Sequence, residues 1–239
     1  MVKEVDAFFI HGISKEVDPS SYYTPLIEGI RKHLPVDFPL RIHPIDHSHL
    51  LKEKEETLFT WAKGFWYPIT RRWANNYIND VIALSPNETM GSGNFYFDVL
   101  KMIEDKYDEA AKDRPHSKKV IFGHSLGAQI GLFFAFRREL DCLITAGGPM
   151  NYFAIRFPKF GRYPDATLHR MLCFSYRQDL VVNGPMGKNP NYSRPQVTDV
   201  ILPLYNPWYW RPTKAHMRFF TDPRVHKITA ANLLEVSGK

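Results

Sequence analysis

The turn from Gly123 to Gly127 carries the residue types best suited to chemistry. Its sequence is Gly-His-Ser-Leu-Gly, with Ser125 at the centre. A serine on a sharp turn between a strand and a helix presents its hydroxyl group above the strand end, where it can attack a carbonyl carbon. The turn strains the serine backbone, so the neighbours two residues away must be small. We therefore predict that Ser125 is a nucleophile, and not a serine that only caps a helix.

The residues on either side of this turn supply the strand and the helix that the pattern requires. Residues 120–122 form a short apolar run typical of a buried strand, and an almost wholly apolar helix is expected after the turn. Ala128 and Gly131 would let this helix lie close to the sheet. The backbone N–H of Leu126 would then lie at a helix amino terminus, where donors lack partners and the dipole favours negative charge.

Apolar runs alternate with helical periodicity along the rest of the chain. Strands are expected at 5–10, 40–45, 142–146, 168–176 and 197–204, and helices at 20–34, 94–112 and 223–234. Such alternation is typical of α/β folds. We predict a single α/β domain over residues 1–239, with a mostly parallel central sheet and helices on both faces.

An aromatic stretch at 57–78 stands apart from these elements. Apolar and aromatic residues recur there every three or four positions, and Gly64 and Pro68 interrupt them, which predicts a kinked helix or two shorter ones. We interpret the stripe as core packing, with a lid or a membrane-facing surface as alternatives. Segments 46–84 and 150–165 are the candidate lid or substrate wall.

Three separated signals make the chain resemble the α/β-hydrolase-fold serine hydrolases, in particular compact lipase-like and esterase-like members. These signals are His11-Gly12 after the first expected strand, the serine turn, and His216 with aromatic residues just downstream. The likeness extends over about residues 5–234. It implies the fold and a catalytic triad whose members follow in the chain order serine, acid, histidine.

The resemblance implies Asp179 as the acid of this triad. Asp179 follows an expected strand directly, which is the place of the acid in this fold. The competing carboxylates are Asp141, Asp165 and Asp199.

The resemblance implies His216 as the base. His216 lies in an expected loop between the last strand and the closing helix, whereas the runner-up, His226, falls inside that helix. His124 fills the variable position of the serine turn and is expected to pack beside the site.

Two backbone N–H groups aimed at a developing oxyanion would lower the barrier to attack on a carbonyl. Leu126 is expected to supply one of them. The resemblance implies that Ile13 supplies the other, with His11 and Gly12 shaping the turn, and Gly12 would allow the backbone to approach closely.

The expected reaction is hydrolysis of a carboxylic ester through an acyl-enzyme on Ser125. Aromatic residues near 151–163 and 205–210 favour an apolar acyl group. The expected substrate contacts are Tyr152, Phe153, Trp208 and Trp210. A thioesterase, an acyltransferase or an amidase would use the same triad, and a non-catalytic binding protein of the same fold is the other alternative.

No cofactor or metal is expected. A histidine-rich patch is present, but it matches no common pattern of metal ligands. Its members are His11, His43, His47, His49 and Asp46.

Composition limits the other function classes. The net charge is +6, but the basic residues are scattered, so we expect a solvated basic surface and no nucleic-acid partner, with binding to membranes or nucleic acid as an alternative that salt-sensitive binding would reveal. No apolar run approaches a membrane span, and the amino terminus enters a strand without the apolar region of a signal peptide. Cys142 and Cys173 fall within expected strands, which predicts buried free thiols and a cytoplasmic location.

Overall fold

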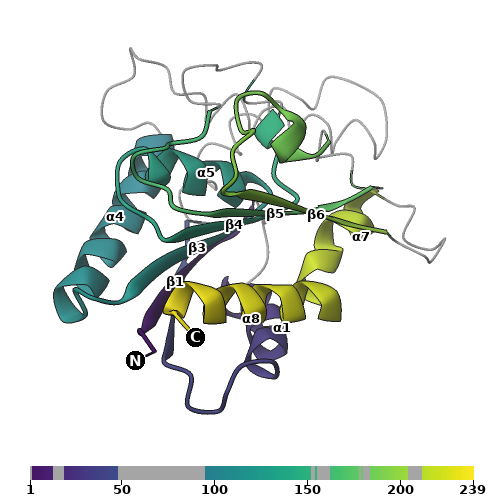
Figure 1. Cartoon of the computed structure of the whole chain (residues 1–239). Coiled ribbons are helices and arrows are strands. Elements are labelled where there is room, and N and C mark those ends of the chain that lie inside the picture. Colours follow the sequence, from purple (N-terminus) through teal and green to yellow (C-terminus); the bar gives the residue numbers. More distant parts are fainter. Residues whose placement is uncertain are drawn as a thin grey trace, which may run out of the picture.

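The computed structural model describes residues 2–12, 19–47, 95–151, 154, 162–177, 179, 184–203 and 212–239. Within these residues, six strands form one sheet in the order β2-β1-β3-β4-β5-β6, and every neighbouring pair is parallel (Figure 1). The strands are β1 (Val5–Ile10), β2 (Leu40–Ile45), β3 (Lys118–His124), β4 (Cys142–Ala146), β5 (Met171–Tyr176) and β6 (Val197–Leu202). The predicted α/β architecture is confirmed.

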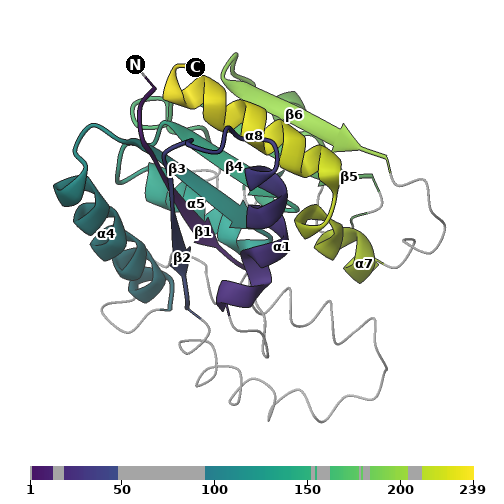
Figure 2. The same cartoon turned by 90° about the horizontal axis from the view of Figure 1, so that it is seen from below.

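Helices cover both faces of the sheet. The described helices are α1 (Pro19–Arg31), α4 (Phe95–Asp113), α5 (Leu126–Ala135), α7 (Pro212–Met217) and α8 (Pro223–Ser237), with short 3₁₀ turns η1 (Met186–Lys188) and η3 (Arg218–Phe220). α4 and α5 lie on one face, and α1 and α8 lie on the other (Figures 1 and 2). The segment around His216, which we expected to be a loop, is the helix α7.

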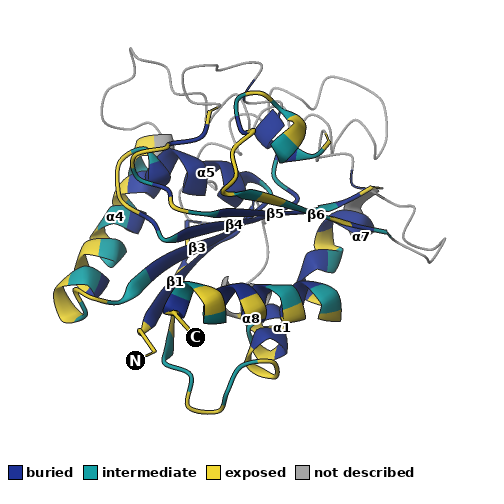
Figure 3. Ribbon diagram, in the orientation of Figure 1, coloured by how far each residue is buried: buried dark blue, intermediate teal, exposed yellow. Residues whose placement is uncertain are grey.

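The sheet separates two apolar cores, and β1 contributes to both. Phe8 and Ile10 pack in the core that includes α4 and α5. Val5, Ala7 and Phe9 pack in the core that includes α1 and α8. Because both faces are covered, the central strands are buried along their length, and this explains their nearly continuous apolar sequences (Figure 3).

The strand order reverses between β1 and β3. The chain passes from β1 through α1 to β2 on one side, and later returns to place β3 on the other side of β1. In open parallel sheets, a crevice forms at the carboxyl ends of the strands at such a reversal, and ligands bind there. Gly12 follows the carboxyl end of β1 and Ser125 follows that of β3, so both lie at this point.

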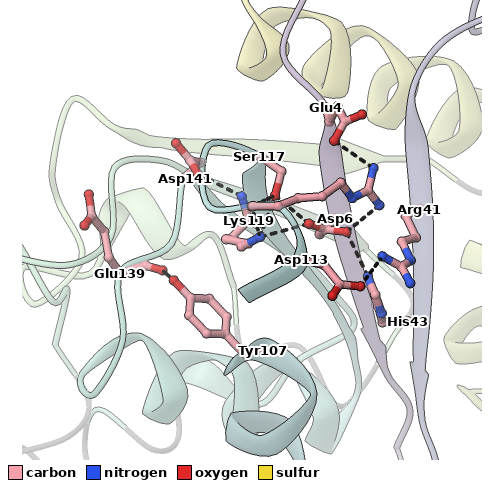
Figure 4. A network of polar contacts seen from close by, with 11 residues as sticks. Glu4, Asp6, Arg41, His43, Tyr107, Asp113, Ser117, Lys119, Glu139 and Asp141 are labelled. Atoms are coloured by element: carbon pink, nitrogen blue, oxygen red, sulfur yellow. Dashed lines mark hydrogen bonds and ion pairs between the residues drawn. The ribbon is translucent and has the colours of Figure 1, made fainter. Parts of the chain in front are cut away.

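The buried carboxylate of Asp6 links β1 to β2 and β3 near the amino ends of these strands (Figure 4). Asp6 of β1 accepts hydrogen bonds from Lys119 Nζ at 2.8 Å, from Arg114 at 2.9 Å, from His43 Nε2 at 2.9 Å and from Ser117 Oγ. Burial alone would raise the pKa of Asp6, but the hydrogen bonds from Lys119, Ser117 and His43 outweigh it and lower the pKa to about 2. Asp6 is therefore charged in the folded protein.

Several predicted features lie outside the described residues. They include the aromatic stretch 57–78 and most of the candidate lid or wall segments 46–84 and 150–165. In the described part of the chain, no helix combines the length and the apolar character needed to span a bilayer. Cys142 and Cys173 are buried free thiols, as predicted.

Candidate active site

Ser125 lies on the turn between β3 and α5 in a strained backbone conformation. Its φ is 55° and its ψ is −122°, and it is the only residue other than glycine with a positive φ among those described. Its side chain makes no capping hydrogen bond to α5, while its N–H donates to the carbonyl oxygen of Ala146 at 2.8 Å. A helix cap has an extended backbone and bonds the first turn, so Ser125 is not an ordinary cap. Strain of this kind costs on the order of 1–3 kcal/mol and is typical of functional positions.

Three glycines near Ser125 lie where a side chain would clash with neighbouring atoms. A Cβ on Gly123 would lie 2.5 Å from the carbonyl oxygen of Gly127, and a Cβ on Gly127 would lie 2.0 Å from that of Ile10. A Cβ on Gly12 would lie 2.7 Å from Cβ of Ser125. Small residues are therefore required for α5 to approach β1 and for the turn after β1 to approach the serine.

The predicted oxyanion donors are described in part. Leu126 is the first residue of α5, where backbone N–H groups lack partners within the helix. Ile13 lies outside the described residues, but Gly12, just before it, contacts the Ser125 side chain. His11 donates from Nδ1 to the Gly12 carbonyl oxygen and stacks on His47 with ring centroids 4.1 Å apart. Burial lowers the pKa of His11, so its ring stays neutral at pH 7.

The structure brings His216 and Asp179 together. The Nδ1–H of His216 donates to Oδ2 of Asp179 at 2.9 Å, across 37 residues of sequence. The Asp179 side chain is fully buried, and the His216 side chain is 10% exposed. The Asp179 N–H donates to the carbonyl oxygen of Tyr176 at 3.0 Å, which anchors the carboxylate to the end of β5. A buried carboxylate bonded to Nδ1 leaves Nε2 as the nitrogen that can take a proton.

Gly147, which follows β4, lies against the His216 ring. Its φ is +66°, a value that favours glycine. A Cβ on Gly147 would lie 2.9 Å from both Cε1 and Nδ1 of His216. The preceding residue, Ala146, accepts the hydrogen bond from Ser125 N–H. Ser125 and His216 therefore both lie near the carboxyl end of β4. Gly147 was not among the predicted site residues, although the turn sequence Gly147-Gly148-Pro149 marks this position.

His124 contacts His216 directly. It is buried at the end of β3, and its Nε2–H donates to the backbone carbonyl oxygen of His216 at 2.8 Å. The two ring centroids are 4.6 Å apart. Burial lowers the pKa of His124 well below 6.5 and the nearby His216 lowers it further, so the ring is neutral. Its position in the motif predicted packing beside the site, but not this hydrogen bond.

The three competing carboxylates have partners elsewhere. Asp141 pairs with Lys118. Asp165 pairs with Arg194. Asp199 accepts hydrogen bonds from two backbone N–H groups at the start of η1. Each of these acids is thus engaged in holding a loop or a strand.

The other candidate histidines have structural positions. His226 donates to the carbonyl oxygen of Phe220 at 2.9 Å and packs where Gly29 of α1 meets α8. His43 bonds the buried Asp6. In the part of the chain that the structure describes, no three His, Cys, Asp or Glu side chains are grouped so that they could hold a metal ion. His49 lies outside that part, as do the four expected substrate contacts Tyr152, Phe153, Trp208 and Trp210.

Comparisons with known proteins bear on the fold. No protein-family model matches the chain, and no curated protein matches it in sequence. Among solved structures, XC6422 from Xanthomonas campestris, described as a member of a/b serine hydrolase without lid, is 14% identical, with 99% of this chain and 82% of that chain covered and a TM-score of 0.53. Est1E from Butyrivibrio proteoclasticus is 13% identical, with 98% and 90% covered and a TM-score of 0.52. By its all-parallel sheet and this similarity, the chain has the α/β-hydrolase fold.

Proposed function

We propose that the protein is a serine hydrolase that cleaves carboxylic esters, with Ser125 as nucleophile, His216 as base and Asp179 as the acid that orients the base. One observation carries the proposal: a strained serine and a buried histidine–carboxylate pair lie at the same end of the sheet. A serine hydroxyl needs a base that is itself held by a third group, and these residues can supply both.

The reaction would begin when His216 Nε2 takes the proton of Ser125 as its oxygen attacks the ester carbonyl carbon. The Asp179 carboxylate, already bonded to Nδ1–H, would stabilise the resulting imidazolium. The protonated His216 would then give its proton to the leaving alcohol, which leaves an acyl group on Ser125. Water, activated by the same histidine, would release the acid and restore the enzyme.

The tetrahedral intermediate would place an oxyanion near two backbone donors. Leu126 lies at the amino end of α5, where the helix dipole adds a favourable field. The second donor would be the N–H of Ile13, since Gly12 already lies against the serine. Two such donors lower the barrier by several kcal/mol.

The similarity in fold to XC6422 supports a hydrolase. We propose a small-molecule ester with an apolar acyl group as substrate, on the basis of the aromatic residues Tyr152, Phe153, Trp208 and Trp210. Nothing in the proposed triad calls for a metal or a cofactor. The buried free thiols of Cys142 and Cys173 support a reducing, cytoplasmic location.

Hydrolysis of p-nitrophenyl esters of increasing acyl length tests the proposal. The wild type should turn over these esters, Ser125→Ala should lose at least about 10³-fold in kcat, and the exposed Ser193→Ala should match the wild type. Matched thioester and anilide substrates would identify a thioesterase or an amidase. Hydrolysis that survives in Ser125→Ala would contradict the proposal, and a folded wild type that cleaves none of these substrates would favour the non-catalytic binding protein.

A further inference from the structure

We propose that His124 is a positioning residue: its imidazole holds the backbone of His216 and thereby aims the His216 ring at Ser125. This inference rests on the proposed role of His216 as base. It assigns a specific task to the residue in the variable position of the serine turn.

His124 is well placed for this task because it belongs to the rigid centre of the sheet. It is the last residue of β3 and pairs with Ala146 of β4. Its side chain is buried, and its Nε2–H donates to the His216 carbonyl oxygen at 2.8 Å across 92 residues of sequence. The residue next to the nucleophile therefore bonds the residue that would activate it.

The element that carries His216 needs such an anchor. α7 spans only the six residues Pro212–Met217 and is followed at once by the 3₁₀ turn η3. So short a helix has little stability of its own. Asp179 holds the His216 side chain at Nδ1, and His124 holds its backbone, so the ring is fixed at two separate points. A misplacement of about 1 Å in a catalytic group can cost about 10²-fold in rate.

The surroundings also keep His124 uncharged. A carbonyl oxygen can only accept, so Nε2 of His124 carries a proton in this hydrogen bond. Burial, together with the neighbouring His216 and His11, holds the pKa of His124 far below 6.5. A second cation therefore does not form beside His216 when that ring takes the serine proton. His124 can hold the base without opposing its protonation.

The chain offers a matched control in His226. Its Nε2–H also donates to a backbone carbonyl oxygen, that of Phe220, at 2.9 Å, and its side chain is also buried. The ring of His124 packs against that same Phe220, with centroids 4.6 Å apart. His124→Phe and His226→Phe each remove one buried imidazole–carbonyl hydrogen bond in the same region. Only the first removes the bond to His216.

The kinetic test compares these two variants with the wild type on a p-nitrophenyl ester. We expect His124→Phe to lower kcat on the order of 10²-fold with KM within about twofold. His226→Phe should keep kcat within about threefold. Equal losses of kcat in the two variants, or an unchanged kcat in folded His124→Phe, would overturn the inference.

A second pair of variants covers the case in which His124→Phe does not fold. The amide of His124→Gln can reach the His216 carbonyl oxygen as a donor, whereas the shorter His124→Asn cannot. We expect Gln to retain at least about tenfold more kcat than Asn. Equal kcat in the two variants would overturn the inference.

A spectroscopic measurement separates this inference from the proposed function. The proton shared by His216 Nδ1 and Asp179 should give a far-downfield NMR signal in the wild type. In His124→Phe and His124→Asn the hydrogen bond to the His216 backbone is missing, so this signal should be lost or broadened. It should be unchanged in His226→Phe. If the wild type proves inactive, the proposed function fails while this comparison still decides the positioning role. A signal unchanged in all variants would overturn it.

Discussion

The Asp179 carboxylate is fully buried and accepts the Nδ1–H of His216, so its exchange for an amide has a defined consequence. In Asp179→Asn, the amide nitrogen would favour the His216 tautomer that carries its proton on Nε2, and this nitrogen could no longer accept the serine proton. We expect kcat for ester hydrolysis to fall by about 10³- to 10⁴-fold with little change in KM. Steady-state kinetics on the folded variant checks this.

The control for this variant is Asp165→Asn. Asp165 is a surface carboxylate paired with Arg194, and this pair is well exposed. Its removal should leave kcat within about twofold of the wild type. If Asp179→Asn kept more than about a tenth of the wild-type kcat, the orienting role of Asp179 would be wrong.

The burial of His124 predicts how the free energy of unfolding changes with pH. In the folded protein burial, above all, holds the pKa of His124 well below 6.5, whereas the unfolded chain takes up a proton there below about pH 6.5. The unfolded state then binds more protons, so the free energy of unfolding falls as the pH drops from 7 to 5. Urea unfolding at several pH values should show a smaller fall in His124→Gln than in the wild type. An equal fall of the free energy of unfolding in the two proteins would contradict this prediction.

At the scale of elements, the contact between α5 and β1 sets the serine turn. A methyl group on Gly127 would meet the Ile10 carbonyl oxygen at 2.0 Å, and backbone atoms on both sides cannot move aside easily. We expect Gly127→Ala to lower the free energy of unfolding by about 3 kcal/mol, at the upper end of the overpacking range. It should also reduce the proposed ester hydrolysis, because α5 carries the Leu126 N–H that we propose as an oxyanion donor. Urea denaturation and kinetics measure the two effects.

Gly131→Ala is the matched control within the same helix. Both substitutions replace a glycine of α5 by alanine. At Gly131, however, the nearest atoms to the new methyl group would be side-chain atoms, Cγ2 of Ile121 and Cδ1 of Leu143, both at 2.9 Å. Side chains give way more readily than backbone, so the loss of stability should be about 1 kcal/mol, at the lower end of the overpacking range. If the two variants were equally destabilised, the backbone contact between Gly127 and Ile10 would not be what limits substitution in α5.

The elements themselves were largely predictable, because buried parallel strands have apolar sequences that local pattern reveals. β2 and β4 have the predicted bounds. β3 spans Lys118–His124 rather than 120–122, because its backbone pairs with all of β1, a contact that no local pattern indicates. The expected start of β5 at Leu168 was wrong, because Leu168 makes only an isolated bridge with Leu140. The helix α7 begins at Pro212, a residue favoured at a first helical position, and this was the available signal.

At the scale of the whole molecule, Asp6 holds the end of the sheet opposite the site. Asp6→Asn would leave the buried Lys119 amine without the charge of Asp6, and Arg114 would keep only its pair with Glu4. We expect the free energy of unfolding at pH 7 to fall by about 3–5 kcal/mol, as for other broken buried ion pairs. Asp113→Asn, which removes an exposed pair with Arg41, should cost under about 1 kcal/mol.

The same carboxylate predicts an acid transition. Hydrogen bonds to Asp6 overcome the effect of burial and lower its pKa from 3.8 to about 2, so the unfolded chain takes up a proton there at a higher pH than the folded one. Its contribution to stability is therefore complete above about pH 4 and is lost as the pH falls toward 2. Denaturant unfolding from pH 5 to pH 2 should show a smaller loss in Asp6→Asn than in the wild type. An equal fall of the free energy of unfolding in Asp6→Asn and the wild type would contradict this prediction.

Contacts between distant segments are what the sequence could not indicate. His124 and His216 are 92 residues apart, and Lys119 and Asp6 are 113 apart. Such pairs depend on strand order and register, which apolar runs leave open. The serine turn was predictable because its small residues and its flanking elements lie within one short segment. The His216–Asp179 pair was implied only through the resemblance in fold.

Labelling with a fluorophosphonate probe tests the central claim most directly, because the probe reacts only with an activated serine. We expect the wild type and Ser193→Ala to be labelled at the same rate, Ser125→Ala to take up no probe, and His216→Ala and Asp179→Asn to react at least about 10²-fold more slowly. A folded wild type that stays unlabelled, or labelling that persists in Ser125→Ala, would contradict a catalytic triad of Ser125, His216 and Asp179.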